Sequence, residues 1–477
     1  MYNDSDATVR TAVLEPLIIP GSYQPFLVFD RFVIYTALVA AVTTTNTKCH
    51  GTGTVKQADS DQAFTTHERA SEARVLRLTF AGHGMVHLLE GVIPPLIPLL
   101  MLQFGTNYFR IGLVATVFTY LFGLGALPSG VAVDYIGARR LLSIFFVSAG
   151  LLSVLVIFVD SYPGYLVIMA LVGIAASLYH PAGLTFISQE ACERGRAFGI
   201  HGIGGSLGIA LAPVLAAFLG SQFGWRTPHV VFGVFSIMLG IWSLNHGTVS
   251  SSSRHASRKP KEKHKPRSRE TVLMLGLMYA SFAVLGLAYR GMTTFLPAYM
   301  AQEVRLGGAL VNPVIVGGTV ATIALVSGML GQYAGGLIAD RVRPEVYYAG
   351  ATAVAGVLAL AMSFFSGLLL VVVAIAQAFC AFAAQPVQNL LVSKYLSRNK
   401  QGLAFGFKYL MIFGIGSLSA TLSGFLADRF GLASVFAAMS LFYFSGAVMG
   451  ISLWKVGNRQ VDTPGDTSTD TPGNTEP

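Results

Sequence analysis

Long runs of hydrophobic residues, separated by short polar segments, dominate the chain from residue 77 onward. A helix needs about 20 mainly apolar residues to cross about 30 Å of hydrocarbon, and each run reaches about that length. No segment shows the period-two alternation of a transmembrane β-strand. The pattern therefore predicts an all-α membrane protein with twelve transmembrane helices. The predicted helices cover residues 77–102, 111–133, 140–160, 163–188, 196–220, 227–247, 271–300, 313–338, 345–365, 367–391, 402–427 and 431–454.

A polar and basic segment, SSSRHASRKPKEKHKPRSRE (residues 251–270), separates the first six predicted helices from the last six. Its composition is typical of a flexible linker. We expect two six-helix bundles, with disordered polar extensions at both ends of the chain. The expected segments are an N-terminal extension 1–75, a first bundle 76–248, a cytoplasmic linker 249–270, a second bundle 271–456 and a tail 457–477.

One apolar stretch, FLVFDRFVIYTALVAAV (residues 26–42), lies inside the N-terminal extension. It is consistent with an interfacial helix, a thirteenth span, or translated sequence upstream of the true start. Because Asp30 and Arg31 interrupt so short a stretch, we expect it not to span the bilayer.

The two halves resemble each other in sequence. Residues 195–224 align without gaps on residues 402–431 at an offset of 207, with ten identical positions that include Gly224 and Gly431. At an offset of 206, the second predicted helix aligns on the eighth, and Gly112 falls on Gly318. Two consistent offsets indicate two six-helix pseudo-repeats. Parallel repeats of this kind are typical of transporters, with a site near the membrane midplane between the halves.

The charge distribution predicts the orientation of the helices. Of the chain's residues, 53% are hydrophobic and only 12% are charged, with a formal net charge of +9. If the first span starts inside, the inner loops carry seventeen Lys and Arg residues and the outer loops carry four. This bias predicts a cell (inner) membrane protein with both termini in the cytoplasm. Since the positive charge is spread over short loops, it argues against a nucleic-acid partner, and three distant cysteines indicate no Cys-rich metal site.

A charged loop after the second predicted helix carries the first family resemblance. GVAVDYIGARR (residues 130–140) resembles the loop 2–3 signature of the major facilitator superfamily, with Tyr135 in place of the usual basic residue. The second-half copy, GLIADRVRP (residues 336–344), has Arg343 where the second glycine would be, so we expect a different turn there. The resemblance implies that an acidic residue of the loop latches a gate, although anchoring at the headgroups is an alternative. The gating candidates are Gly130, Asp134, Gly137, Arg139, Arg140, Gly336, Asp340 and Arg341.

The resemblance extends over residues 74–456. Two segments, SLYHPAGLTFISQ and GRAFGIHG, are similar to bacterial members near the fosmidomycin-resistance group. The resemblance implies a secondary transporter that works by alternating access in the lipid bilayer, and we expect a monomer. It also implies that spans one and seven face each other across the cavity.

Three ionisable residues lie in the first predicted helix, FAGHGMVHLLEGVIPPLIPLL. At about 100° per residue, His83, His87 and Glu90 fall on one face. A carboxylate at bilayer depth is costly, so such residues mark functional sites, and histidine titrates close to neutral pH. The stripe predicts a proton site, while an interfacial position for His83 and a structural hydrogen bond for Glu90 are alternatives. Arg290 in span seven is a candidate partner for Glu90 or for an anionic substrate.

Other polar residues in the predicted helices are further candidates. His201 and Lys408 occupy the same position of the repeat, and His180 lies near the middle of span four. Snorkelling of Lys408 to the interface and a structural role for His180 beside Pro181 are alternatives. In GIALAPVLAA (residues 208–217) we expect close helix packing. The packing candidates are Gly208, Ala212 and Pro213.

Together these features predict a secondary transporter of a small organic compound, with protons as coupling ions and efflux as the leading direction. Uptake of an organic anion and a sensor that has lost transport are the alternatives. We expect no cofactor and no metal site, and the sequence lacks the nucleophile, metal or phosphate-binding constellation of an enzyme.

Overall fold

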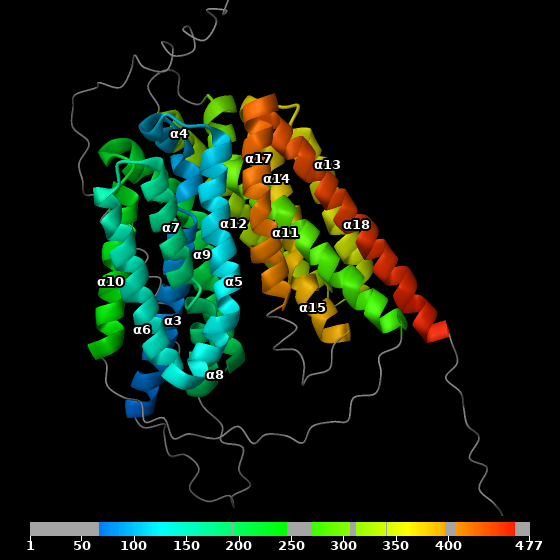
Figure 1. Cartoon of the computed structure of the whole chain (residues 1–477). Helices are drawn as coiled ribbons and strands as arrows, with labels where there is room; N and C mark the ends of the chain where they lie inside the picture. Colours follow the sequence, from blue (N-terminus) through cyan, green and yellow to red (C-terminus); the bar gives the residue numbers. More distant parts are fainter. Residues whose placement is uncertain are drawn as a thin grey trace, which may run out of the picture. The chain divides into compact units, whose positions relative to one another are not determined.

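The computed structural model (Figure 1) describes residues 66–191, 194–245, 269–305, 312–339, 341–395 and 407–462. All of them belong to one compact unit, Cys49–Pro477. Within these residues every regular element is a helix, and twelve helical segments are long and apolar enough to cross a membrane. The prediction of an all-α protein with twelve transmembrane helices is confirmed. The expectations for residues 1–65, for most of the linker and for Asp340 lie outside the described residues.

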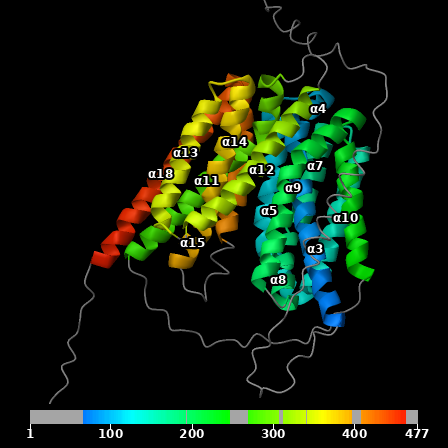
Figure 2. The ribbon, with the colours of Figure 1, turned by 180° about the vertical axis from the view of Figure 1, so that it is seen from behind.

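The first half contains six spans, two of which are interrupted (Figures 1 and 2). Span one consists of α3 and α4, and span four consists of α7 and α8. Proline explains both interruptions, because it lacks an N–H and clashes with the carbonyl of the preceding turn; Pro94 and Pro181 follow the two breaks. The elements are α3 (Thr66–Glu90), α4 (Ile93–Phe104), α5 (Tyr108–Ile136), α6 (Ala138–Val154), the 3-10 turn η1 (Leu155–Phe158), α7 (Tyr162–Ala176), α8 (Tyr179–Glu190), α9 (Arg194–Phe223) and α10 (Thr227–Asn245).

The second half also contains six spans, but span seven, the counterpart of span one, is a single helix, α11. Span ten is interrupted at Ala384, before Pro386, and span eleven, which begins at Phe407, contains a π-helical turn, η4. Short π-helical segments are frequent at functional sites. The elements are α11 (Arg269–Glu303), α12 (Pro313–Ala339), α13 (Pro344–Met362), α14 (Gly367–Ala383), α15 (Gln385–Tyr395), η4 (Leu410–Ile415), α17 (Gly416–Phe430) and α18 (Leu432–Asp462).

Equivalent helices pack in equivalent pairs within each half. In the first half α3 packs on α9, α5 on α7 and α6 on α10; in the second half α11 packs on α17, α12 on α14 and α13 on α18. The aligned glycines Gly224 and Gly431 both have positive φ, 95° and 82°. Glycine adopts this conformation without steric cost, so the same turn ends spans five and eleven.

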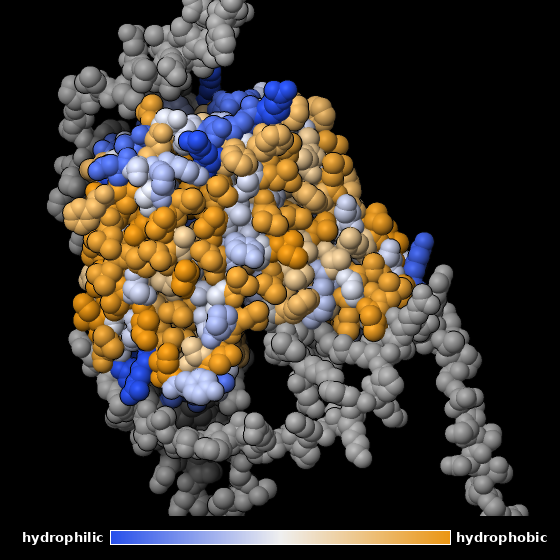
Figure 3. All heavy atoms as spheres, viewed as in Figure 1, coloured by the Kyte–Doolittle hydropathy of each residue, from blue (hydrophilic) through white to orange (hydrophobic). Residues whose placement is uncertain are grey.

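Contacts between the halves join spans two and eleven, spans five and eight, and spans one and seven. We name the two ends of the bundle after α5: the Asp428 end, where α5 begins beside the end of α17, and the Asp134 end, where α5 finishes. The face drawn in Figure 3 is hydrophobic across its middle and hydrophilic near both ends, as expected for a bundle surrounded by lipid.

The structure differs from the expected boundaries at both ends of the membrane region. α3 begins at Thr66, inside the expected extension 1–75, and α18 continues to Asp462, into the expected tail. The sequence preceding span one, THERASEARV, is rich in Ala, Glu and Arg, which favour helix. Polar residues that no hydrophobic run marks therefore extend these helices beyond the apolar stretches.

Candidate functional site

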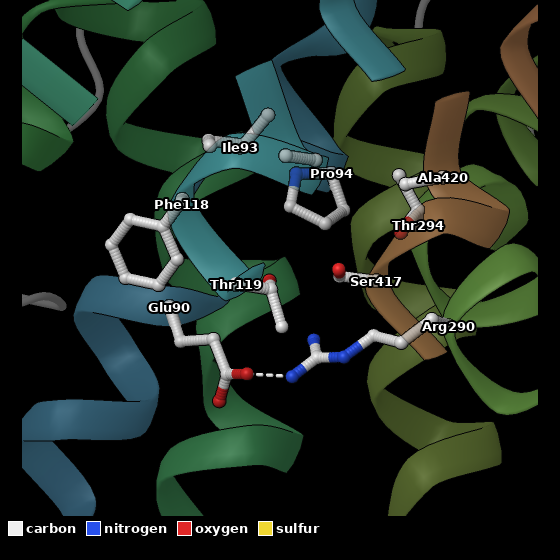
Figure 4. Close-up of a pocket in the computed structure, with 10 residues that line it drawn as sticks. Glu90, Ile93, Pro94, Phe118, Thr119, Arg290, Thr294, Ser417 and Ala420 are labelled. Atoms are coloured by element: carbon white, nitrogen blue, oxygen red, sulfur yellow. Dashed lines mark hydrogen bonds and ion pairs between the residues drawn. The ribbon is translucent and has the colours of Figure 1, made fainter. Parts of the chain in front are cut away.

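Glu90 and Arg290 form an ion pair between the two halves (Figure 4). Glu90 is the last residue of α3 and only 9% exposed, and Arg290 lies within α11 with 13% of its side chain exposed. α3 ends here because Pro94 cannot donate a hydrogen bond to the Glu90 carbonyl. The guanidinium of Arg290 donates to Oε1 of the carboxylate. This pairing is one of the two alternatives that the sequence predicts for Arg290, and the structure brings the two residues together.

A small cavity of about 10 Å³ adjoins the ion pair. That volume is close to the minimum that holds one water molecule, so the cavity has no room for an organic compound. Figure 4 shows that α4, α5, α11 and α17 all contribute to its wall. The residues that line it are Glu90, Ile93, Pro94, Ala115, Phe118, Thr119, Arg290, Thr294, Ser417 and Ala420.

A chain of hydrogen bonds continues from Glu90 along α3. His87 Nδ1 lies 2.7 Å from the second carboxylate oxygen of Glu90, Oε2. His87 Nε2 lies 3.2 Å from His83 Nε2, and His83 Nδ1 lies 2.7 Å from the carbonyl oxygen of His201. The three residues predicted to share one face of the helix are therefore connected, and the chain runs from α11 through α3 to α9.

Two further histidines surround this chain. The His201 ring stacks on His83 with centroids 4.0 Å apart, and its Nδ1 lies 3.2 Å from the carbonyl oxygen of Thr79. The His180 ring lies edge-on to His83 at 5.2 Å, and its Nε2 atom is buried with no hydrogen-bond partner among the described residues. His180 belongs to α8, directly after the break in span four. The break thus places a polar ring next to the α3 histidines.

Tyr179 was not a candidate from the sequence. Its hydroxyl donates to the Thr79 carbonyl oxygen at 2.7 Å, and its ring stacks beside His83 and His201. The tyrosine preceding His180 in LYHPAG is the only sequence signal for it. It holds the Asp134 part of α3 against α8.

The nitrogen atoms of His83, His87 and His180 lie within 4.8 Å of one another, close enough to hold a metal ion. Hydrogen-bonded imidazoles have the same spacing, and one such bond, between His83 and His87, is present. The absence of a metal site therefore stays a prediction.

Lys408 is buried in the second half, at the position equivalent to His201. It is 5% exposed, and its ammonium donates to Asn389 Oδ1 at 2.6 Å. It also lies 5.7 Å from the centroid of the Phe282 ring. The Lys408 side chain is itself buried, but the amide that it reaches belongs to Asn389, an exposed residue, so snorkelling of Lys408 toward the interface stays an alternative. Asn389, which receives it, was missed in the sequence.

The loop 2–3 signature contains one structural turn and one helix cap. Gly137 has φ of 88° and joins α5 to α6, a conformation that favours glycine. Arg139 donates to the Ser243 carbonyl at 2.6 Å and thereby satisfies the end of α10. At the second copy Arg343 has φ of −64°, which confirms that the turn differs there.

The remaining gating candidates lie at the surface of the Asp134 end. Asp134, Arg140 and Arg341 are exposed. No heavy atom of the described residues lies within 4 Å of a Cβ built at Gly130, and Gly336 meets only Pro386 at 4.0 Å. Neither glycine therefore marks a close approach of a neighbouring helix in this state.

Close packing of the halves occurs instead nearer the Asp428 end. A Cβ at Gly112 would overlap the carbonyl oxygen of Ala420 in α17, and a Cβ at Gly318 would overlap that of Pro213 in α9. Ala420 and Pro213 are equivalent in the repeat, so the two contacts are related by pseudo-symmetry. The packing candidate Pro213 thus contacts the other half.

The other two packing candidates bring α9 against span one. A Cβ at Gly208 would overlap the Gly84 carbonyl oxygen, and fully buried Ala212 faces Gly91. Small residues allow helices to approach this closely.

A second pair of equivalent contacts uses threonine. Thr116 Oγ1 accepts a hydrogen bond from the backbone N–H of Thr421 at 3.1 Å. Thr322 Oγ1 accepts one from the backbone N–H of Val214 at 3.2 Å. The two threonines occupy equivalent positions of the repeat, and so do the two residues whose backbone N–H groups donate to them. Each half therefore binds the other through equivalent residues.

At the Asp428 end one contact breaks this symmetry. The Asp428 carboxylate accepts hydrogen bonds from the backbone N–H groups of Tyr108 and Phe109 at 2.9 Å and 2.8 Å. These belong to the first turn of α5, where N–H groups lack partners in the helix. The equivalent of Asp428 in the first half is Ser221, so the repeat gave no indication of this contact.

At the Asp134 end, in contrast to the Asp428 end, spans four and ten do not join the two halves. α8 packs on α3, α5, α6 and α9, and α15 packs on α11, α12, α13 and α14. Each therefore packs mainly within its own half. In both ribbon views α11 and α18 diverge from the first half toward this end (Figures 1 and 2). The described state is closed at the Asp428 end and separated at the Asp134 end.

Comparison with known proteins agrees with the fold. The Major Facilitator Superfamily profile matches residues 79–407 and 313–474. The chain is similar to a probable L-galactonate transporter of Escherichia coli (26% identity over 141 residues, 29% of this chain and 31% of the relative). It is also similar to a probable sugar efflux transporter of Mannheimia succiniciproducens (28% identity over 130 residues, 27% of this chain and 33% of the relative). These alignments span about a third of each relative.

A solved structure covers far more of the chain. A bacterial homologue of the human lysosomal transporter Spinster, solved in an inward-facing and unoccupied conformation, has a TM-score of 0.66 and 13% identity over 83% of this chain and 99% of that chain. At this identity the likeness concerns the fold.

Proposed function

Because this chain belongs to the major facilitator superfamily, we propose that it is a secondary transporter that moves a small organic compound by alternating access, coupled to protons. The observation that carries the proposal is the buried ion pair between Glu90 of the first half and Arg290 of the second. The family is one of transporters rather than enzymes, in agreement with the prediction from the sequence.

The ion pair makes separation of the two halves energetically costly unless both charges find new partners. Removing one partner of a buried ion pair costs about 3–5 kcal/mol, because an uncompensated charge remains. If the halves rock apart at this point, Glu90 and Arg290 each need a new partner. A proton can neutralise the carboxylate, and a substrate group can occupy the guanidinium. Movement of the halves is then linked to ion and substrate binding.

We propose efflux as the leading direction, with a proton entering as the organic compound leaves. In such an exchange, the proton on Glu90 and the substrate on Arg290 occupy the site of the ion pair in alternation. The similarity to a probable sugar efflux transporter supports this direction. The closer resemblance to the fosmidomycin-resistance group stays a prediction, and it favours the same direction.

Uptake of an organic anion together with a proton is the second candidate. The Nε atom of Arg290 is buried without a hydrogen-bond partner among the described residues, so the guanidinium has donor capacity left for a carboxylate. The similarity to a probable L-galactonate transporter supports an anionic compound. In this mechanism the anion takes Arg290 while a proton neutralises the released Glu90.

We also propose that the protein is a monomer in the cell (inner) membrane with both termini in the cytoplasm. The excess of Lys and Arg in the loops at the Asp134 end supports this orientation, which makes the Asp134 end cytoplasmic. Accessible tags at residue 260 and at the C-terminus should both be cytoplasmic, and a tag at residue 307 should be outside. The reverse pattern would contradict the orientation.

The substrate should be sought with a compound-susceptibility panel that compares cells with and without the protein. Protection by expression indicates efflux and sensitisation indicates uptake. The compound found is then tested in proteoliposomes for accumulation driven by a pH gradient and for counterflow. If no counterflow occurs with a compound that binds the purified protein, the chain is a sensor with a transporter fold and the proposed transport is wrong.

A further inference from the structure

The geometry of the hydrogen-bond chain on α3 determines how many hydrogens its contacting nitrogen and oxygen atoms must share. It consists of three contacts: His201 carbonyl oxygen to His83 Nδ1, His83 Nε2 to His87 Nε2, and His87 Nδ1 to Glu90 Oε2. Each contact needs one hydrogen. A carboxylate and two neutral imidazoles supply only two, because each neutral imidazole carries one N–H.

The position of each hydrogen follows from its neighbours. A backbone carbonyl only accepts, so the hydrogen of the first contact belongs to His83 Nδ1. If His83 is neutral, its Nε2 then carries a lone pair. Glu90 accepts from Arg290 at its other oxygen, which favours the carboxylate and places the third hydrogen on His87 Nδ1. His87 Nε2 then also carries a lone pair, and two lone pairs would face each other over 3.2 Å.

We propose that the His83–His87 pair holds one exchangeable proton between its two Nε2 atoms and that this pair, with Glu90, is the proton-binding site of the transport cycle. The role of this site in a transport cycle rests on the proposed function. The number of hydrogens in the three contacts depends on their geometry alone. In the loaded state Glu90 lies between two cations, Arg290 and the histidine pair.

Loss of the proton changes the contact between the halves. Without it the His83–His87 bond cannot form, and Glu90 is left with Arg290 as its single cationic partner. The ion pair between the halves then tightens. Binding of the proton has the opposite effect, because the histidine pair then carries a positive charge and shares the Glu90 carboxylate with Arg290 as a second cation. The proton thus acts on the relative position of the halves through one carboxylate.

His180 is positioned to pass the proton on. Its unpartnered Nε2 is buried, and its nitrogens lie within 4.8 Å of those of His83 and His87. Its ring stacks on Tyr409, at the edge of η4, with centroids 6.2 Å apart. The other titratable or charged groups that face the pair from the helices around it are Tyr179 of α8, His201 of α9 and Arg290 of α11.

The test is nitrogen NMR of the purified full-length protein labelled with 15N-histidine, recorded from about pH 5 to about pH 8. This measurement separates Nδ1–H, Nε2–H and doubly protonated imidazole. We expect one hydrogen shared between His83 and His87 at the acidic end, lost as the pH rises. The shared signal should disappear in His83→Gln and His87→Gln. It should persist in His229→Gln, a matched control, because buried His229 contacts only Tyr165 and Trp225 among the described aromatic residues.

Two outcomes would overturn the proposal. One is a pair of neutral imidazoles with no shared hydrogen over the whole pH range in the wild-type protein, which needs no variant to fold. The other is a metal: histidine signals that change with a chelator, accompanied by bound zinc that is lost in His180→Gln. Neither result depends on flux, so either one leaves the proposed coupling at Glu90 to its own test.

Discussion

The carboxylate of Asp428, at the end of α17, accepts a hydrogen bond of 2.9 Å from the backbone N–H of Tyr108, the first residue of α5. A negative charge at a helix N-terminus is stabilising because it complements the helix dipole. The contact joins the two halves at the end where they are closed. We expect this contact to act as a latch on that closure.

Replacing Asp428 with Asn should weaken this latch. The charge contributes about 0.3–1 kcal/mol at an exposed helix N-terminus, which corresponds to a shift of about two- to fivefold toward the state that is open at the Asp428 end. A single cysteine at Thr119, which lines the cavity, reports the shift through labelling from that side in a cysteine-free background. Unchanged labelling would show that Asp428 caps α5 without holding the gate.

Asp134→Asn should have the opposite effect. Asp134 is exposed at the separated end, so any latch that it forms belongs to the state closed at the Asp134 end. Its loss should favour the described state and reduce labelling of the Thr119 cysteine from the Asp428 side. The same result as for Asp428→Asn, or no change with normal transport, would remove the latch role of the loop signature.

Gly112→Ala and Gly318→Ala should both oppose closure at the Asp428 end, because the added Cβ would overlap backbone of the other half. Overpacking typically costs about 1–3 kcal/mol. Labelling at Thr119 from that side should therefore rise. Gly350→Ala is the matched control, since no heavy atom of the described residues lies within 4 Å of its added Cβ. Equal labelling in the three variants would contradict the packing argument.

The sequence predicted the elements better than the contacts between them. The repeat placed Gly112 over Gly318, but their role became visible only when each glycine met the opposite half. Periodicity within a helix says nothing of which face another bundle will cover. Asp428 was missed because its equivalent is Ser221, so comparison of the halves hid it. An acidic residue at the end of an apolar span was the available signal.

The charges inside the membrane were predicted more fully. Glu90, His87 and His83 share one face because of their helical spacing, and that spacing is visible in the sequence. Their proximity to His180 depends on the break in span four. The sequence does not show how this break changes the direction of the helix that follows it. The hydrogen bond from Lys408 to Asn389 depends on the interruption of span ten at Ala384.

Arg290→Ala alone should lower membrane expression and thermal stability more than the double variant Glu90→Gln with Arg290→Ala. The single change leaves Glu90 as a buried carboxylate without its guanidinium, at a cost of about 3–5 kcal/mol. The double change removes both charges. Expression level and thermal unfolding of the purified variants measure the difference. If the double variant is the less stable of the two, the pair contributes packing rather than charge compensation.

The most direct measurement is transport by Glu90→Gln in proteoliposomes, with the compound identified by the susceptibility panel. Glutamine keeps the size of the side chain but cannot bind and release a proton. Accumulation driven by a pH gradient should fall to the background of empty liposomes, while counterflow, which needs no net proton movement, should persist. If Glu90→Gln accumulates the compound against its gradient as the wild-type protein does, Glu90 is a packing residue and proton coupling at the ion pair is wrong.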